Sequence, residues 1–320
     1  MTDNRKKEIT DKYLKSSNDD SILELSVQEL IYLYSAVLAE QKKDPENKEW
    51  AERRQYVFSS VIMRFMNSDE LYIAYHVMTN YPYIDVRGCA WLFTEKEFSK
   101  AAHEHYFKEG VPLTMKTVTG KDAVVEQLLE LLRIGVEQII VDNGQPNVTI
   151  RLKDIITGSG ENGQLTTTCP ELMFTIINAL ELSYASDGKH PDLPALDKKT
   201  EELVKSSRLL VPIKLDRHLE DGESLHITEE TPSQIAVVNP LKTEKGFIAA
   251  FTDWKEFTKL YSKDEWNAVI MDHTTLKDAA SRVDGFIINP AGFMINPSTR
   301  DAASFSVVWS IITAFHSSFE

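Results

Sequence analysis

Two short segments of this sequence, 252–254 and 272–273, carry side chains suited to acid–base chemistry or to ligand binding. The first follows an apolar run at 246–251 and the second an apolar run at 268–271, as is typical of strands that pass into helices. Parallel strands bring their carboxyl ends to the same edge of a sheet, where ligands of open α/β proteins often bind. The resulting candidate binding site consists of Thr252, Asp253, Trp254, Asp272 and His273.

These residues admit two interpretations. As an enzyme of unfamiliar type, the chain would use a site around Asp253, Asp272 and His273, because a positioned carboxylate or imidazole can transfer protons. Thr252 and Asp253 are also preferred helix-capping residues, which indicates a structural role. The sequence favours capping and leaves the enzyme as an alternative.

The cysteines and the other histidines form no recognisable reactive or metal-binding set. Cys89 lies inside an apolar run, which predicts a buried thiol, and Cys169 precedes Pro170 at a helix start, which favours a structural position. His103 and His105 are two residues apart on an expected helix and therefore point to different faces. The sequence has no phosphate-binding, dinucleotide-binding or serine-hydrolase motif. We therefore expect no cofactor and no metal.

Charge and composition exclude several classes of partner. The 320 residues include 49 acidic and 35 basic side chains, a formal net charge of −14 that repels phosphate backbones and anionic membranes. Two cysteines predict a reducing compartment, and residues 1–20 lack the apolar core of a secretory signal. The apolar stretch at 307–315 is shorter than the roughly 20 residues of a membrane helix. We expect a cytoplasmic protein that binds neither nucleic acid nor membrane.

The sequence repeats one pattern. Segment 88–95 matches segment 246–253, with Gly, Phe, Thr and an acidic residue in register 158 residues apart. Segment 115–123 matches segment 271–279 at a separation of 156 residues. Because repeated segments in the same order indicate repeated structure, these matches predict a tandem duplication.

Helix starts support the same duplication. Capping boxes are expected at Ser26–Glu29 and Thr168–Glu171, and again at Thr94–Glu97 and Asp253–Glu256. The distance in sequence from the matched segment 115–123 or 271–279 to the strand after it is about nine residues shorter in the second copy. The helix from Thr119 should therefore run at least two turns longer than the helix near Thr275.

The expected fold is an α/β fold with mixed sheets, in two related units. Each unit has two helices followed by the order β-β-α-β-α-β-β. The second unit ends in a C-terminal helix that would cover its own sheet or the junction of the two copies. Its apolar residues at helical spacing are Phe305, Val308, Trp309, Ile312 and Phe315. The boundaries are a flexible tail at 1–20, the first unit at 21–157, a linker at 158–165 and the second unit at 166–320.

The second copy carries five motifs in a fixed order, which are Arg208–Ile213, Ile235–Pro240, Gly246–Trp254, Ala268–Asp272 and Asp284–Gly292. In this order and spacing they resemble the SseB N-terminal domain family, named after a bacterial protein of enhanced serine sensitivity. The resemblance covers about residues 200–300 and implies a bacterial cytoplasmic α/β module without established catalytic residues. The first copy departs from it, with Ala74-Tyr75 in place of Val211-Pro212 and Val141-Asp142-Asn143-Gly144 in place of the Asn-Pro turn.

Three functional hypotheses follow. The leading one is a non-catalytic binding or regulatory module of the SseB-like type, with a protein or small molecule as its partner. The alternatives are the enzyme described above and an immunity-like or structural partner of another bacterial protein.

Overall fold

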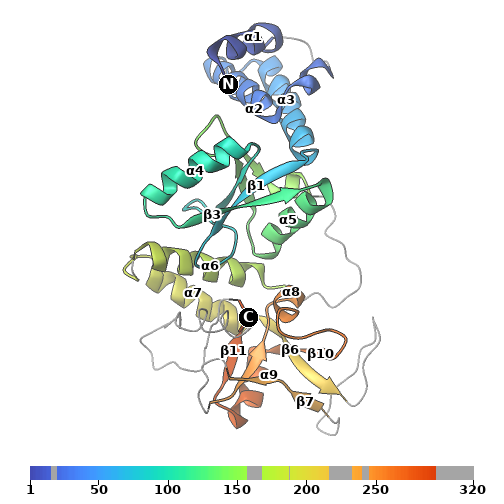
Figure 1. Cartoon of the computed structure of the whole chain (residues 1–320), viewed down its shortest axis with the longest axis vertical. Helices are drawn as coiled ribbons and strands as arrows, with labels where there is room; N and C mark the ends of the chain where they lie inside the picture. The colour runs from blue at the N-terminus through green and yellow to red at the C-terminus, as the bar shows by residue number, and fades with distance from the viewer. Residues whose placement is uncertain (16–19, 157–167, 187, 216–232, 240–244, 293–320) are drawn as a thin grey trace. The chain divides into compact units, whose positions relative to one another are not determined.

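The computed structural model describes residues 1–15, 20–156, 168–186, 188–215, 233–239 and 245–292. The chain divides into two compact units (Figure 1). The first comprises Met1–Leu132 and Val136–Thr157, and the second comprises Arg133–Gly135 and Gly158–Glu320. The expected linker at 158–165 and the expected helix around 305–315 lie outside the described residues.

The first unit begins with helices that pack on one another: α1 (Asp3–Tyr13), η1 (Asp20–Glu24), α2 (Val27–Lys43) and α3 (Lys48–Met66). The prediction of a flexible tail at 1–20 is wrong for α1. Ile9 and Tyr13 lie one helical turn apart and are buried, while Arg5 Nε donates to Glu29 of α2 at 2.6 Å. Burial of these apolar side chains holds the N-terminal helix in place.

A five-stranded mixed sheet forms the centre of the first unit. Its strands are β1 (Glu70–His76), β2 (Cys89–Phe93), β3 (Leu113–Thr119), β4 (Gln138–Val141) and β5 (Val148–Arg151), in the spatial order β3-β1-β2-β4-β5. β2 and β4 are parallel, and the other neighbours are antiparallel. Helices α4 (Lys96–Lys108) and α5 (Lys121–Arg133) make the connections between strands, and η2 (Leu152–Asp154) follows β5.

The second unit follows a similar order of elements but has two additional short strands. Two helices, α6 (Pro170–Ala185) and α7 (Leu193–Ser206), precede the strands β6 (Arg208–Leu215), β7 (Ser233–Ile235), β8 (Val237–Val238), β9 (Phe247–Ala250), β10 (Asn267–Asp272) and β11 (Phe286–Ile288). Between these strands lie the short helices α8 (Trp254–Phe257), α9 (His273–Ala279) and η3 (Ala280–Arg282). The strands form two three-stranded sheets, β10-β6-β7 and β11-β9-β8. The predicted α/β class is thus confirmed.

The strand order in the two units corresponds. An antiparallel bridge between Leu210 and Phe251 joins β6 to the residue that follows β9. The resulting order β10-β6-β9-β11 has the same pair orientations as β3-β1-β2-β4 of the first unit. Phe93 pairs with Tyr72 of β1 as Phe251 pairs with Leu210 of β6, so β2 and β9 hold equivalent places.

The register downstream differs from the predicted match of segments 115–123 and 271–279. Tyr72 and Leu210 are equivalent, because they pair with Phe93 and Phe251. On their other sides, Tyr72 pairs with Thr117 and Leu210 pairs with Ile270. Thr117 and Ile270 are therefore equivalent, and they lie 153 residues apart rather than 156. The predicted alignment was therefore wrong by three residues. Helix α5 has 13 residues and α9 has 7, so the first helix is longer as predicted, but by less than the expected two turns.

The predicted caps have mixed outcomes. Ser26 forms a complete capping box with Glu29, and the Asp253 carboxylate accepts from the Glu256 amide at 3.0 Å. The box predicted from Thr94 is absent, because the Thr94 hydroxyl donates to Asp142 instead. α6 begins after Cys169, one residue later than a box from Thr168 requires.

Each unit has its own apolar core beside the sheet. In the first unit, alternate residues of β2 pack with apolar side chains of α4 in a cluster that includes Cys89, Trp91, Phe93 and Ala102. In the second unit, Phe251 and Phe257 form the centre of an aromatic cluster with Trp254, Tyr261 and Trp266. Within the described ranges, none of the helices has the length and apolar character needed to cross a bilayer.

A glycine of the second unit provides a test of its packing. Gly135 has φ +83°, and a Cβ there would overlap the Pro170 carbonyl oxygen and lie 2.9 Å from Phe174 Cβ. Gly144 has φ +89° but has no atom within 4 Å of the same position. Both alanine variants incur the left-handed backbone cost of about 1–2 kcal/mol. Only Gly135→Ala adds overpacking, of about 1–3 kcal/mol.

We therefore expect Gly135→Ala to lower the free energy of unfolding by more than Gly144→Ala. Urea denaturation of both variants measures the difference, and equal losses would contradict the close approach of Gly135 to α6.

Candidate functional site

The ends of β9 and β11 in the second unit are joined by a buried polar pair. Thr252 follows β9 and Asn289 follows β11, and both are fully buried. Asn289 has φ +50°, in the left-handed region that asparagine adopts more readily than most residues. Its Oδ1 accepts from the Thr252 amide at 3.0 Å, and its Nδ2 donates to Thr252 Oγ1 at 2.9 Å. Neither polar side chain is therefore left unsatisfied.

The first unit has the same pair with a carboxylate as the acceptor. Thr94 lies next to the end of β2, and Asp142, with φ +61°, follows β4. The Asp142 carboxylate accepts from Thr94 N and from Thr94 Oγ1, both at 2.8 Å. We call Thr94 with Asp142, and Thr252 with Asn289, the strand-end pairs.

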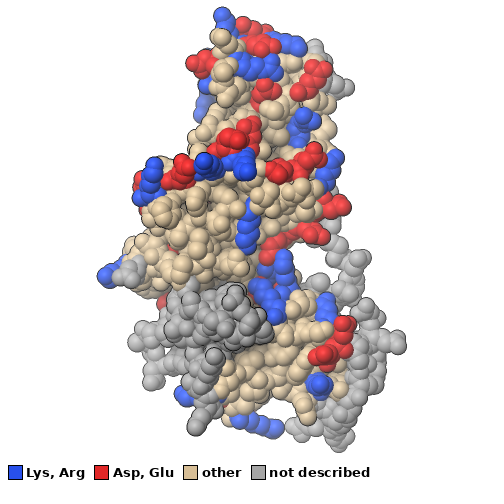
Figure 2. All heavy atoms as spheres, viewed as in Figure 1, with Lys and Arg blue, Asp and Glu red and all other residues tan. Residues whose placement is uncertain are grey.

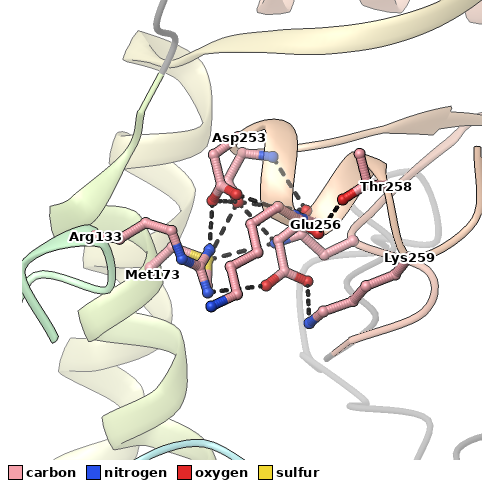
Figure 3. Close-up of polar contacts among 9 residues, drawn as sticks. Arg133, Met173, Asp253, Glu256, Thr258 and Lys259 are labelled. Carbon is pink, nitrogen blue, oxygen red and sulfur yellow. Dashed lines mark hydrogen bonds and ion pairs between the residues drawn. The ribbon is translucent and has the colours of Figure 1, made fainter. Parts of the chain in front are cut away.

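Asp253 belongs to a buried network of charges (Figure 3). Arg133 Nη1 lies 2.6 Å from Asp253 Oδ2, and Arg133 Nη2 lies 3.2 Å from Glu256 Oε1. Lys259 Nζ lies 2.6 Å from the other oxygen of Glu256. Arg133 is assigned to the second unit, so the network lies within that unit. Two cations balance two carboxylates whose side chains are 4% and 0% exposed.

All four carboxylate oxygens in this network have partners. Asp253 Oδ1 accepts from the Glu256 amide, and Oδ2 also accepts from Thr252 Oγ1 at 3.0 Å. A carboxylate held in this way would lose a hydrogen bond or an ion pair if it took a proton from a substrate. The arrangement favours the structural interpretation of Thr252 and Asp253.

Trp254 lies at the start of α8 and packs into the aromatic cluster. Its ring meets Phe257 edge to face at a centroid distance of 5.0 Å, and Lys263 Nζ lies 4.5 Å from the Trp254 ring centroid. These contacts are worth about 0.5–1.5 kcal/mol each beyond burial. Trp254 thus stabilises the segment that carries Asp253 and Glu256.

Asp272 and His273 lie at the end of β10. Asp272 caps α9 by accepting from the Thr275 amide at 2.8 Å, and this hydrogen bond lowers the pKa of the exposed carboxyl group. His273 meets the Phe286 ring edge-on at 6.0 Å. Neither residue forms a hydrogen bond with Asp253.

The strands explain this separation. β9 and β10 run in the same direction, as expected, but β6 lies between them. The ends of β9 and β10 are therefore two strand spacings apart, which is roughly 10 Å. The structure therefore brings Thr252, Asp253 and Trp254 together and places Asp272 and His273 beyond an intervening strand.

The two thiols are held in their protonated forms. Burial raises the pKa of Cys89, whose side chain belongs to the core of the first unit as predicted. Burial also raises the pKa of Cys169, whose Sγ donates to the Arg208 carbonyl at 3.6 Å. Over the part of the chain that the structure describes, no group of three or more His, Cys, Asp or Glu residues has the arrangement of a metal site.

Sequence reasoning missed Arg133 and the pairing of Thr94 with Asp142 and of Thr252 with Asn289, and it identified Glu256 only as a capping residue. Arg133 lies 120 residues from Asp253 in the sequence, and no local pattern marks such a contact. Asp142 and Asn289 did stand out, but only as turn residues. The signal that could identify them is a polar residue directly after a buried parallel strand, opposite a threonine in the same place on the neighbouring strand.

Comparison of the chain with family models, with curated proteins and with solved structures gives no match.

The charge network generates a stability prediction. Arg133→Met should lower the free energy of unfolding by about 3–5 kcal/mol, because two buried carboxylates lose their shared cation. The control is Arg151→Met, which removes an exposed pair with Asp154 whose arginine side chain is 58% exposed. That change should cost about 0–1 kcal/mol. Denaturant titration followed by tryptophan fluorescence compares the two, and similar small losses would show that Arg133 is not buried between the carboxylates.

Proposed function

We propose that this chain is a non-catalytic binding module of the SseB-like type that acts in the bacterial cytoplasm and recognises a protein partner. The observation that supports it most is a group of exposed apolar side chains in the first unit. Val77, Met78, Val86 and Phe107 are 51%, 40%, 91% and 68% exposed. We call these four residues the loop patch.

The topology places the loop patch at one end of the sheet. β1 ends and β2 begins there, so the connecting residues 77–88 lie at that end. β3 also begins there, and Val77 N donates to the Pro112 carbonyl at 2.8 Å. Phe107 lies in the last turn of α4, which leads into this start of β3. Single exposed apolar residues are common, whereas a group at one end indicates an interaction site.

Hydrogen bonds hold the loop that presents Val86. The buried Asp85 carboxylate accepts from Arg87 N at 2.9 Å, from Cys89 N at 3.0 Å and from Trp91 Nε1 at 3.1 Å. Gly88, with φ +78°, closes the turn. A side chain on a rigid turn loses little conformational entropy on binding, which favours affinity.

The turn that carries Val77 and Met78 is fixed in a similar way. Asn80, with φ +53°, donates its amide to the His76 carbonyl at 2.9 Å. His76 Nδ1 accepts from the Thr79 amide at 3.4 Å. Burial lowers the pKa of His76 to about 4, so the ring stays neutral and keeps this acceptor at physiological pH.

Charge suggests the chemistry of the partner. The chain has a net charge of −14, which favours an apolar partner surface with a neutral or basic rim. Figure 2 shows acidic and basic side chains alternating along α4, beside a largely uncharged surface.

The matching strand orders and strand-end pairs of the two units support our further proposal that they arose by duplication.

Substitutions in the loop patch test the proposal. Met78→Glu combined with Val86→Glu should weaken partner binding about tenfold or more, because a buried charge at an apolar contact costs at least 1.4 kcal/mol. The matched control is Met63→Glu on α3, since Met63 is 46% exposed and lies outside the patch. The thermal melting temperature of the double variant should stay close to that of the unmodified chain.

The measurement is affinity purification from bacterial lysate followed by titration of the purified partner against each variant. Equal affinity of the patch variant and the Met63→Glu control would contradict the loop patch as the binding surface.

A further inference from the structure

Asp142 is a fully buried acid that forms no ion pair with a cation of the described residues. Its Oδ1 accepts from Thr94 N at 2.8 Å. Its Oδ2 accepts from Thr94 Oγ1 at 2.8 Å and from Gln28 Nε2 of α2 at 3.4 Å. Hydrogen bonds from neutral groups thus hold the charged form in place, without the counter-charge that usually accompanies a buried carboxylate.

The charged residues on the neighbouring elements do not supply that counter-charge. Glu95, the exposed residue directly before α4, acts on Asp142 with a like charge. On α2, Glu29 is engaged by Arg5 Nε at 2.6 Å and by Ser26 N at 2.9 Å. Burial is the main cause that raises the pKa of Asp142 to about 6, and the charge of Glu95 adds to it.

The second unit shows which hydrogen bonds a protonated acid would make here. Asn289 occupies the equivalent place and carries hydrogens on the atom that faces the threonine hydroxyl, to which it donates at 2.9 Å. Its oxygen accepts from the Thr252 amide, as Asp142 Oδ1 accepts from the Thr94 amide. A proton on Asp142 Oδ2 would donate to Thr94 Oγ1 in the same manner, so the site fits both forms.

From this geometry we propose that Asp142 is a proton-binding site that makes the stability of the first unit depend on pH in the mildly acidic range. The second unit, with an amide at the equivalent position, lacks this response. Because the folded state binds the proton more tightly than the unfolded chain, stability from this group is present at low pH. It is lost as pH rises from about 4 through about 6.

The expected effect is large enough to measure. The pKa of Asp142 rises from 3.8 to about 6, which corresponds to roughly a 100-fold change in the unfolding equilibrium constant of the first unit. Solution NMR of the full chain observes the event directly, because the Thr94 amide proton bonds to the titrating group. Its chemical shift should titrate with a midpoint near pH 6, while the Thr252 amide serves as an internal control and stays constant.

Two variants separate proton binding from a merely structural role. In Asp142→Asn, which copies the second unit, the Thr94 amide titration should disappear, and stability should exceed that of the unmodified chain at pH 7.5 but not at pH 4.5. Glu95→Gln removes the like charge from an exposed position and should lower the midpoint while the titration persists. A Thr94 amide shift that stays flat between pH 4.5 and 8, or a stability difference between Asp142→Asn and the unmodified chain that is independent of pH, would overturn the proposal.

Discussion

The strand-end pair is the interaction on which each unit depends. Two parallel strands end side by side in each unit, and a threonine follows one of them. The backbone amide and the hydroxyl of this threonine need partners inside the protein, because a buried polar group without a partner costs about 1–3 kcal/mol. Asp142 and Asn289 meet this need from the left-handed conformation, which lets their side chains reach back to Thr94 and Thr252. The pair fixes where β2 or β9 stops and the next helix begins, and so it positions Glu95 and Asp253.

The order of helices and strands could be predicted from the sequence because apolar runs, capping residues and turn residues are local signals. Ser26 and Glu29 show this, since both partners of their capping box lie within one turn. The predictions were wrong where a distant contact competed with a local one. Thr94 bonds to Asp142 rather than to its own helix, and Ile9 and Tyr13 bury the N-terminal helix that a polar composition had marked as a tail.

The distinction between local sequence signals and contacts between distant residues also applies to the candidate site and to function. Asp253 was identified from its place after a strand, but Arg133, which balances its charge, comes from a distant part of the sequence. Asp272 and His273 share the sheet edge with Asp253, yet the strand order that separates them is not encoded in their spacing. The polar groups around Asp253 are engaged in bonds within the unit. The function that we propose therefore assigns recognition to the exposed loop patch.

A double-mutant cycle on each strand-end pair tests this account most directly. Thr252→Val and Asn289→Ala, singly and together, report their coupling in the free energy of unfolding, and Thr94→Val with Asp142→Ala does the same for the first unit. The backbone cost of alanine at φ > 0 cancels within each cycle. We expect coupling energies of about 1–3 kcal/mol in both units. Values near zero in either cycle would contradict the claim that these pairs organise the ends of the strands.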